Sequence, residues 1–321
     1  MPAQFLSCDW GTSSFRLRLV STATNETLAK VTATTGVKEL FEQATQRAVF
    51  PAGLFAEIAA KHIREIALRH TLNGQPLIIS GMASSAIGWK ELPYASVPIP
   101  LDATGLRVEE IRWESPEGLG PTYIVSGAST ESDVMRGEEC QAIGIMAEPA
   151  MLPFREGATL VLPGTHSKHI DIEFGKIKDF KTFMTGELFE TVSQHTVIKP
   201  TVDASAATQA HPGEFRAGVK MAYENGLAAS LFKVRARGVL NKIPAADNAA
   251  FLSGLLIGAE VAYLASLETD PDWPIIVAAD EKLSKLYALA LPQRERVIFV
   301  EVGRATITAH RLILSRLFNE V

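Results

Sequence analysis

A four-residue motif, Gly-Thr-x-Ser, occurs twice in the chain and constrains its fold more than any other feature. It stands at Gly11–Ser14 and again at Gly164–Ser167. An apolar run precedes each copy and a segment of alternating apolar and polar residues follows it, which is the pattern of two strands joined by a tight turn. The apolar runs are Phe5–Cys8 and Thr159–Leu162, and the alternating segments are Phe15–Val20 and Ile170–Phe174.

The similarity of the two halves continues beyond the motif. Each continues into a third strand-like segment that ends in Thr-Gly, at Thr35–Gly36 and Thr185–Gly186. Buried strands at 76–79 and 123–125 then match those at 274–277 and 297–300, and helices are expected at 132–148 and 305–318. Each half is therefore expected to contain three antiparallel strands followed by helix, strand, helix, strand and helix. This order of elements, present twice, predicts two similar α/β lobes.

The boundary between the lobes is predicted where Pro, Gly and charged residues cluster, at 149–157. We therefore assign residues 1–150 to the first lobe and 151–321 to the second, which also holds a helical insertion at about 212–267. The last helix either completes the second lobe or packs back on the first. Gly254 and Gly258, one turn apart in the insertion, are expected to permit close helix packing.

Composition limits the class of protein. Apolar residues make up 47% of the 321 residues and charged residues 21%, as is typical of a globular protein. The net charge of −5 argues against nucleic acid or an anionic membrane as a partner. Cys8 and Cys140 have no metal-ligand spacing, and we expect buried thiols in a reducing compartment.

The longest apolar tract, 249–267, contains Glu260, which would be costly inside a membrane. We therefore expect a helix buried between other elements. Asp9 interrupts the first apolar stretch, so no secretory signal is expected. A cytoplasmic protein is predicted, and its oligomeric state, a homodimer included, is left open.

The paired turns favour a nucleotide as the ligand. Glycine at a tight turn lets backbone N–H groups approach an anion, and Thr and Ser hydroxyls add donors. Two such turns across a cleft between the lobes could hold a polyphosphate from both sides. The expected nucleotide-binding residues at the turns are Gly11, Thr12, Ser13, Gly164 and Thr165.

Charged residues beside the turns suit phosphoryl transfer. Asp9 could bind Mg²⁺ directly or through water, although Asp before glycine is also a common turn former. Arg16 and Lys168 could neutralise charge on the transferred group. His166 either contacts a phosphate or substrate or faces solvent.

Around these turns the sequence resembles known kinases. Asp9–Arg16 is similar to the first phosphate motif of the sugar kinase, Hsp70 and actin superfold. The segments that resemble 2-dehydro-3-deoxygalactonokinases are Gly81–Ser85 with its continuation to Tyr94, Asp133–Glu139, Pro163–Lys168 and Met184–Phe189. The resemblance covers the chain from Asp9 to about His195.

This resemblance implies two ribonuclease H-like lobes with a nucleotide cleft between them. It also implies phosphorylation of the 6-hydroxyl of 2-dehydro-3-deoxy-D-galactonate, with ATP and Mg²⁺, as a step of galactonate catabolism. The substrate rests on the resemblance alone, because a fold does not by itself define a substrate.

Two acidic residues compete for the role of catalytic base. Asp133 is expected at the start of the helix 132–148, where it either accepts the proton of the attacking hydroxyl or only complements the helix dipole. Glu187 is the rival base, with first-turn charge on its own helix as the alternative. Arg136 and Glu138 are expected to form a pair that shapes the cleft, and Arg136 could also contact a substrate carboxylate.

The remaining expected substrate-binding residues come from the family-like segments. They are Met82, Ser84, Ser85, Trp89, Thr185 and Gly186. Trp89 is expected either to wall the sugar-acid pocket or to pack in the core.

Two positions depart from the family pattern. Many members carry an arginine after Gly-Ser in the Gly-Met segment, where this chain continues Ser84–Ser85–Ala86. Another group must then meet the substrate carboxylate, or the substrate differs. Glycines usually lie beneath adenine in such kinases, but this chain has Ala278–Glu281, in which Asp280 could bond a ribose hydroxyl.

Two alternatives remain open. The first is a kinase of the same superfold that acts on another sugar, polyol or keto acid. The second, favoured by the altered segment around Asp280, is a non-catalytic sugar- or nucleotide-binding regulator.

Overall fold

The computed structural model describes residues 2–206, 211–266, 273–291 and 297–319. The chain divides into two compact units. The first unit consists of Met1–Glu156, Ile172–Phe180 and Gly303–Val321, and the second of Gly157–Asp171 and Lys181–Val302. The chain therefore passes from one unit to the other near the predicted boundary, but two later segments return to the first.

Both returning segments have partners in the first unit. In the first of these segments, Lys176 pairs antiparallel with Pro100 and Ile177 with Ile99. The last helix packs against a helix and a strand of the first unit. The predicted boundaries, 1–150 and 151–321, assign both of these segments to the second lobe, whereas their contacts lie in the first unit.

The first unit is built around a six-stranded sheet with the order β3-β2-β1-β4-β8-β7. Its core gathers apolar side chains of these strands and of two helices, with Trp10, Phe15 and Phe55 among the fully buried. The elements are β1 (Gln4–Trp10), β2 (Phe15–Ser21), β3 (Thr27–Ala33), α1 (Val37–Arg47), α2 (Pro51–Ala67), β4 (Gln75–Gly81), η1 (Met82–Ser84), β5 (Ala95–Ser96), β6 (Ile99–Pro100), β7 (Val108–Ile111), β8 (Leu119–Val125), β9 (Ala128–Ser129), β10 (Val134–Met135), α3 (Glu138–Met146), η2 (Pro149–Arg155) and α9 (Ala305–Asn319).

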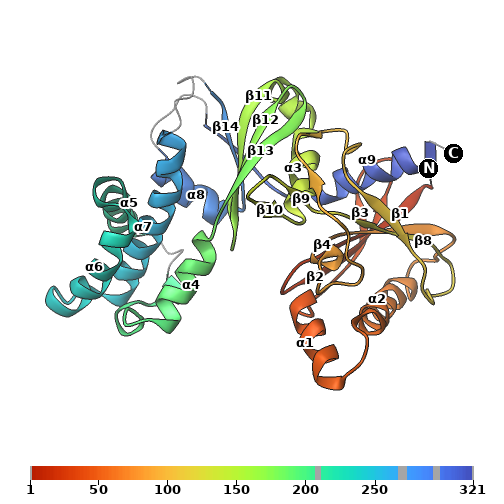
Figure 1. Cartoon of the computed structure of the whole chain (residues 1–321), viewed down its shortest axis with the longest axis horizontal. Coiled ribbons are helices and arrows are strands. Elements are labelled where there is room, and N and C mark those ends of the chain that lie inside the picture. The colour runs from red at the N-terminus through yellow and green to blue at the C-terminus, as the bar shows by residue number, and fades with distance from the viewer. Residues whose placement is uncertain (1, 207–210, 267–272, 292–296, 320–321) are drawn as a thin grey trace. The chain divides into compact units, whose positions relative to one another are not determined.

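The second unit combines a sheet with a group of helices. Its strands follow the order β15-β14-β11-β12-β13, and α4, α5 and α6 all pack against α7 (Figure 1). The elements are β11 (Gly157–Leu162), β12 (Ser167–Glu173), β13 (Lys176–Phe183), α4 (Thr185–His195), η3 (Lys199–Thr201), η4 (Ala204–Ala206), α5 (Pro212–Asn225), α6 (Leu227–Leu240), α7 (Ala245–Ser266), β14 (Ile275–Ala278), α8 (Glu281–Ala290) and β15 (Val297–Val300). Of β12 and β13, the residues Ile172–Phe180 belong to the first unit.

The two sheets confirm the predicted duplication. The order β3-β2-β1-β4-β8 in the first corresponds strand by strand to β13-β12-β11-β14-β15 in the second. β1 pairs antiparallel with β2 and parallel with β4, and β11 pairs parallel with β14. In β2 the buried residues alternate with exposed or half-buried arginines as the sequence predicts.

Two expectations about helices were wrong. No helix lies between β4 and β8, where the chain instead forms η1 and the short strands β5, β6 and β7. The helix predicted at 132–148 is shorter, because β10 pairs with β9 and α3 begins only at Glu138. Gly137, with φ of 110°, makes the sharp change of direction between them.

The apolar tract forms the buried helix that the sequence predicts. α7 is, within the described ranges, a helix long and apolar enough to cross a membrane, yet most of it is buried against other elements. A Cβ at Gly254 would overlap the backbone of Phe215 on α5, and one at Gly258 would lie 2.7 Å from Cα of Val219. The two glycines therefore permit close contact, as predicted. Leu267 lies outside the described residues.

In the first unit, α3 and α9 approach so closely that the position of Gly144 has no room for a side chain. A Cβ there would overlap the carbonyl group of Ala305. We expect Gly144→Ala to lower the free energy of unfolding by about 1–3 kcal/mol, the usual cost of overpacking. Urea unfolding followed by tryptophan fluorescence measures this, since Trp10, Trp89 and Trp113 all lie in the first unit.

Gly53→Ala on α2 is the matched control, because nothing lies within 4 Å of a Cβ at that position. It should leave stability unchanged or raise it by up to about 1 kcal/mol, through helix propensity. Equal stability of the two variants would show that α3 and α9 can separate without cost.

Candidate functional site

The Gly-Thr turn of the second unit joins β11 to β12 and has an open backbone. A Cβ at Gly164 would meet nothing within 4 Å. The Gly164 N–H donates to Oγ of Ser167 at 3.3 Å, which closes the turn. Open backbone at a glycine turn is the kind of surface that a phosphate can approach.

The first turn of α4 packs directly on this Gly-Thr turn. A Cβ at Gly186 would lie 2.7 Å from the Gly164 carbonyl oxygen and from Cα of Thr165, so a side chain there would have to displace the turn. The Glu187 N–H donates to the Thr165 carbonyl at 3.1 Å. The positive end of the α4 dipole thus lies beside the turn, which favours an anion there.

His166 and Glu187, predicted in two different roles, contact each other. Nε2 of His166 pairs with Oε2 of Glu187, and both side chains are exposed. Glu187 is also the acidic residue of the first turn of α4, as its alternative interpretation expected. The structure therefore brings the candidate residues of the turn and of α4 into one cluster within the second unit.

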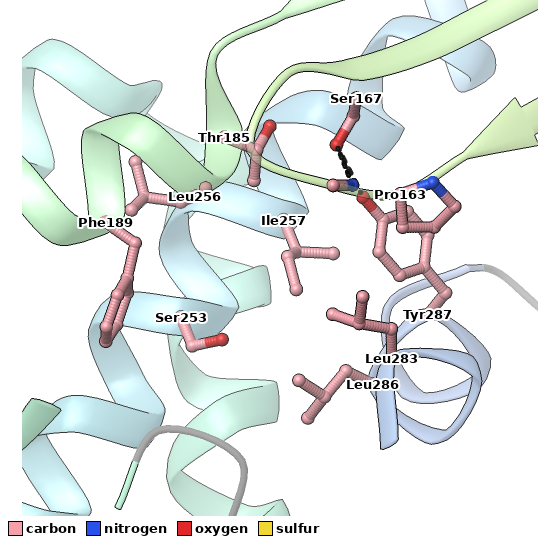
Figure 2. A pocket seen from close by; sticks show the side chains of 12 residues that line it. Pro163, Ser167, Thr185, Phe189, Ser253, Leu256, Ile257, Leu283, Leu286 and Tyr287 are labelled. Carbon is pink, nitrogen blue, oxygen red and sulfur yellow. Dashed lines mark hydrogen bonds between the residues drawn. The ribbon is translucent and has the colours of Figure 1, made fainter. Parts of the chain in front are cut away.

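An apolar pocket of about 150 Å³ opens next to this turn (Figure 2). Hydroxyl groups of Ser167, Thr185, Ser253 and Tyr287 interrupt an otherwise apolar lining. The lining residues are Pro163, Gly164, Ser167, Thr185, Gly186, Phe189, Ser253, Leu256, Ile257, Leu283, Leu286 and Tyr287. An apolar pocket that ends at a glycine turn suits a ligand with an apolar ring at one end and an anion at the other.

Two further candidates of the second unit lie outside this lining. Lys168 is buried in β12, where its Nζ donates to the His166 carbonyl at 2.9 Å. Asp280 is exposed and caps α8 by accepting the Leu283 N–H at 2.9 Å. A cap explains Asp280 by itself, and its role at a ribose stays a prediction. The segment after β14 lines the pocket through Leu283, not through glycines.

The turn of the first unit is built in the same way. The carbonyl groups of Gly11 and Thr12 accept the N–H groups of Val37 and Lys38 at the start of α1, at 3.0 and 3.2 Å. A Cβ at Gly36 would overlap the Thr12 carbonyl and the backbone of Ser13. Since Gly36 follows Thr35 as Gly186 follows Thr185, the duplication extends to this packing.

Asp9 and Arg16 form an ion pair across β1 and β2. The two residues lie opposite each other in the strand register, and Nη1 of Arg16 lies 2.9 Å from Oδ2 of Asp9. The Arg16 side chain is 47% exposed and the Asp9 side chain 16%. Within the described part of the chain, no three His, Cys, Asp or Glu residues gather as metal ligands. The metal-binding role of Asp9 stays a prediction.

Asp133 does not stand at a helix start, which corrects the expectation from sequence. It ends the turn between β9 and β10, where Oγ1 of Thr130 accepts the Asp133 N–H at 2.9 Å. Oδ1 of Asp133 accepts the N–H of Val134 at 2.7 Å. A Thr whose hydroxyl accepts an N–H three residues on can cap a helix or close a turn, and here strand pairing decides for the turn.

Arg136 is held against the segment that follows β4. Its Nη1 donates to the carbonyl and, at 2.8 Å, to Oγ of Ser84, and its guanidinium lies 4.1 Å from the centre of the Tyr94 ring. Oε2 of Glu138 accepts the backbone N–H of Arg136 at 3.1 Å. The structure thus groups Arg136, Ser84 and Glu138 in the first unit.

The other residues of the Gly-Met segment and its continuation lie in or beside the core of the first unit. Trp89 is 7% exposed, and its ring makes edge contacts with Trp10 and Trp113 in the core. Of the two interpretations of Trp89, the structure therefore supports packing. Met82 packs against the same core, and Oγ of Ser85 donates to the Met82 carbonyl at 2.7 Å.

Glu139 is a buried carboxyl group that the sequence interpretation did not single out. Both of its carboxyl oxygens accept the N–H of Gly137, at 2.9 and 2.7 Å. Burial, followed by the negative charge of Glu138, raises the pKa of Glu139 to about 8. The predicted helix 132–148 had placed Glu139 inside a helix, which concealed its position at a helix start. The sequence feature that could have indicated this helix start is a glycine followed directly by two acidic residues.

Comparisons with known proteins agree on one family. The model of a family described as 2-keto-3-deoxy-galactonokinase matches residues 9–311. A protein of Rhizobium meliloti (strain 1021), described as a probable 2-dehydro-3-deoxygalactonokinase, is 33% identical over 297 residues, which cover 89% of this chain and 88% of the relative. The 2-dehydro-3-deoxygalactonokinase of Escherichia coli (strain K12) is 32% identical over 271 residues, which cover 82% and 81%.

A solved structure shows the same fold. It is a crystal structure of a protein from Sinorhizobium meliloti that is proposed to be a 2-dehydro-3-deoxygalactonokinase. It has a TM-score of 0.78 with this chain at 29% identity, and the match covers 98% of this chain and 99% of the other. The fold and the family inferred from the duplication and the motifs are confirmed.

The buried carboxyl of Glu139 should make the stability of the first unit depend on pH. Its pKa in the folded protein, about 8, lies above the ordinary value of 4.5, so the folded state binds more protons between these two pH values. The free energy of unfolding should therefore fall as pH rises from 4.5 to 8, by at most about 1.4 kcal/mol per pH unit. Glu139→Gln should remove this fall and be more stable than the unmodified protein at pH 8.

Urea unfolding at several pH values, followed by tryptophan fluorescence, measures the difference. The exposed Glu57 of α2 provides the control, since Glu57→Gln should leave the pH dependence unchanged. Parallel pH curves for Glu139→Gln and the unmodified protein would contradict the raised pKa.

Proposed function

Because this chain belongs to the 2-keto-3-deoxy-galactonokinase family, we propose that it transfers the γ-phosphoryl group of ATP to the 6-hydroxyl of 2-dehydro-3-deoxy-D-galactonate. The products are the 6-phosphate and ADP, and the reaction is a step of galactonate catabolism. We place it in the cytoplasm, without a nucleic-acid or membrane partner, in keeping with the two buried free cysteines.

The observation that supports ATP most directly is the pocket whose wall includes Gly164 and Gly186. In this proposal the adenine ring occupies the apolar end of the pocket. The phosphates then lie along the open backbone of the Gly164 turn, at the positive end of α4. The apolar lining from α7 and α8 provides the surface that glycines supply in other kinases of this fold.

Charged residues next to the Gly-Thr turn of each unit are proposed to serve phosphoryl transfer. Asp9 would hold Mg²⁺, which, when bound, neutralises charge on the phosphates. One carboxylate is sufficient for this, because Mg²⁺ in such sites binds mostly water and phosphate oxygens. Arg16, held in place by Asp9, and Lys168 add positive charge for the transferred group.

The sugar acid is proposed to bind where Asp133 and Arg136 flank β10. Asp133 accepts the proton of the attacking hydroxyl, since its carboxylate is already fixed by the Val134 N–H. Arg136 pairs with the substrate carboxylate. Its guanidinium reaches Ser84, the segment in which many family members carry an arginine of their own, so Arg136 takes over that role.

The proposed reaction is tested by measuring ADP release from purified protein with a set of acceptors. We expect turnover with 2-dehydro-3-deoxy-D-galactonate and much less with its C4 epimer, with D-galactonate and with polyols. The 6-deoxy analogue should bind but release no ADP, because it lacks the attacking hydroxyl. Turnover with a different sugar, polyol or keto acid would identify the alternative kinase. The absence of ADP release with every acceptor would favour the non-catalytic regulator.

Asp133 and Glu187 differ in a measurable way. Asp133→Asn should lower kcat by about 10²–10⁴-fold, the range for general acid–base catalysis, and leave the affinity for the sugar acid nearly unchanged. Glu187→Gln, which removes the negative charge beside His166, should mainly weaken binding. If Glu187→Gln abolishes turnover while Asp133→Asn does not, the two residues exchange roles.

A further inference from the structure

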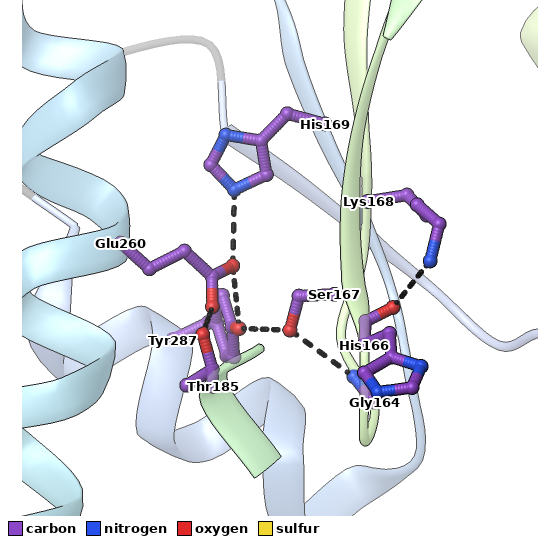
Figure 3. A network of polar contacts seen from close by, with 8 residues as sticks. All are labelled: Gly164, His166, Ser167, Lys168, His169, Thr185, Glu260 and Tyr287. Atoms are coloured by element: carbon purple, nitrogen blue, oxygen red, sulfur yellow. Dashed lines mark hydrogen bonds and ion pairs between the residues drawn. The ribbon is translucent and has the colours of Figure 1, made fainter. Parts of the chain in front are cut away.

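A buried carboxylate stands at the centre of a polar network behind the pocket. Glu260 lies on the apolar helix α7, and its side chain is only 1% exposed. One oxygen accepts from Tyr287 Oη at 2.8 Å and from His169 Nε2 at 3.0 Å, and the other accepts from Oγ1 of Thr185 (Figure 3). All of these residues belong to the second unit.

The partners of Glu260 connect it to three other elements. Thr185 begins α4, His169 lies in β12 and Tyr287 in α8. Oη of Tyr287 also lies 3.3 Å from Oγ of Ser167, which accepts the N–H of Gly164. A continuous path of hydrogen bonds thus runs from the carboxylate on α7 to the backbone of the Gly-Thr turn.

The chemistry of these groups assigns a direction to the path. An ionised carboxylate is only an acceptor, so Tyr287 must donate to Glu260. The oxygen of Tyr287 can then accept from the hydroxyl of Ser167, and Oγ of Ser167 accepts the Gly164 N–H. Burial, and next to it the charge of Glu260, raises the pKa of Tyr287, which keeps the phenol protonated as a donor.

His169 fits the same assignment. Its Nδ1 is buried and has no hydrogen-bond partner, so a proton there would be an unsatisfied buried donor. With the proton on Nε2, the ring donates to Glu260 and no donor is left unpaired on Nδ1. The negative charge of Glu260 is then stabilised by three donors and by the positive end of α4, where Thr185 is the first residue.

We propose that Glu260 is a positioning residue for nucleotide binding, which acts through Thr185, Tyr287 and Ser167. All three of these residues line the pocket, whereas Glu260 and His169 do not. Glu260 holds the start of α4 and the Gly164 turn in one arrangement, so that the backbone that meets the phosphates is already ordered before ATP binds. This inference rests on the proposed binding of ATP in the pocket.

Glu260→Gln tests the proposal because it keeps the size of the side chain and removes its charge. An amide nitrogen would face at least one donor of the network, and the path to Gly164 would loosen. We expect the KM for ATP and the Kd for ADP, measured by calorimetry, to rise about 10-fold. The KM for the sugar acid and kcat at saturating ATP should change less than twofold.

Asn248→Ala is the matched control for loss of a buried polar group on the same helix. Asn248 is fully buried and donates to the carbonyls of Thr201 and Val234, away from the pocket. This variant should lose stability yet keep the Kd for ADP. A fall in affinity of the same size in both variants would show that Glu260 only stabilises the fold, and would overturn the proposal.

Tyr287→Phe tests the path itself and serves also if Glu260→Gln folds poorly. It removes only the hydroxyl between Glu260 and Ser167, and we expect the Kd for ADP to rise about fivefold. In the double variant the two effects should not multiply, because both interrupt one path. Independent effects that multiply would contradict the path through Tyr287.

Binding of ADP by the unmodified protein distinguishes a failure of the positioning role from a failure of the proposed function. If it binds ADP and Glu260→Gln binds ADP equally well, the positioning role is wrong and the nucleotide pocket stands. If the unmodified protein binds neither ADP nor ATP, the proposed function fails, and the role of Glu260 fails with it.

Discussion

The close approach of a helix to a glycine turn is the constraint on which each unit depends. Gly36 and Gly186 lie where any Cβ would overlap the backbone of the turn. Because they have no side chain, α1 and α4 begin directly against the turns, and the carbonyls of Gly11, Thr12 and Thr165 accept the first N–H groups of these helices. In the second unit this contact also forms one wall of the pocket.

The two buried glutamates show how differently one fold can treat a carboxyl group. Burial, followed by the negative charge of Glu138, raises the pKa of Glu139 to about 8, although the N–H of Gly137 donates to its carboxyl group. Glu260 is surrounded by donors from three side chains. A buried charge is costly unless hydrogen bonds replace its hydration.

Local patterns in the sequence predicted much of the fold but not all of it. The alternation in β2 predicts a strand and the apolar run of α7 predicts a buried helix. Burial on one face or on all faces requires apolar residues at particular positions, which are visible in the sequence. The segment Thr130–Asp133 misled, since its hydroxyl and carboxylate groups satisfy N–H groups at a helix start or in a turn equally well. The pairing of β9 with β10 decided between them.

The sequence by itself determined the duplication, the family and the residues of both turns, because these depend on neighbours along the chain. Only the tertiary structure decided which distant side chains meet. It placed Trp89 in the core, brought Arg136 to Ser84 across 52 residues and brought Thr185 to Glu260 across 75. Such contacts depend on how helices and strands pack, and a buried carboxylate acquires its role only from the donors that packing supplies.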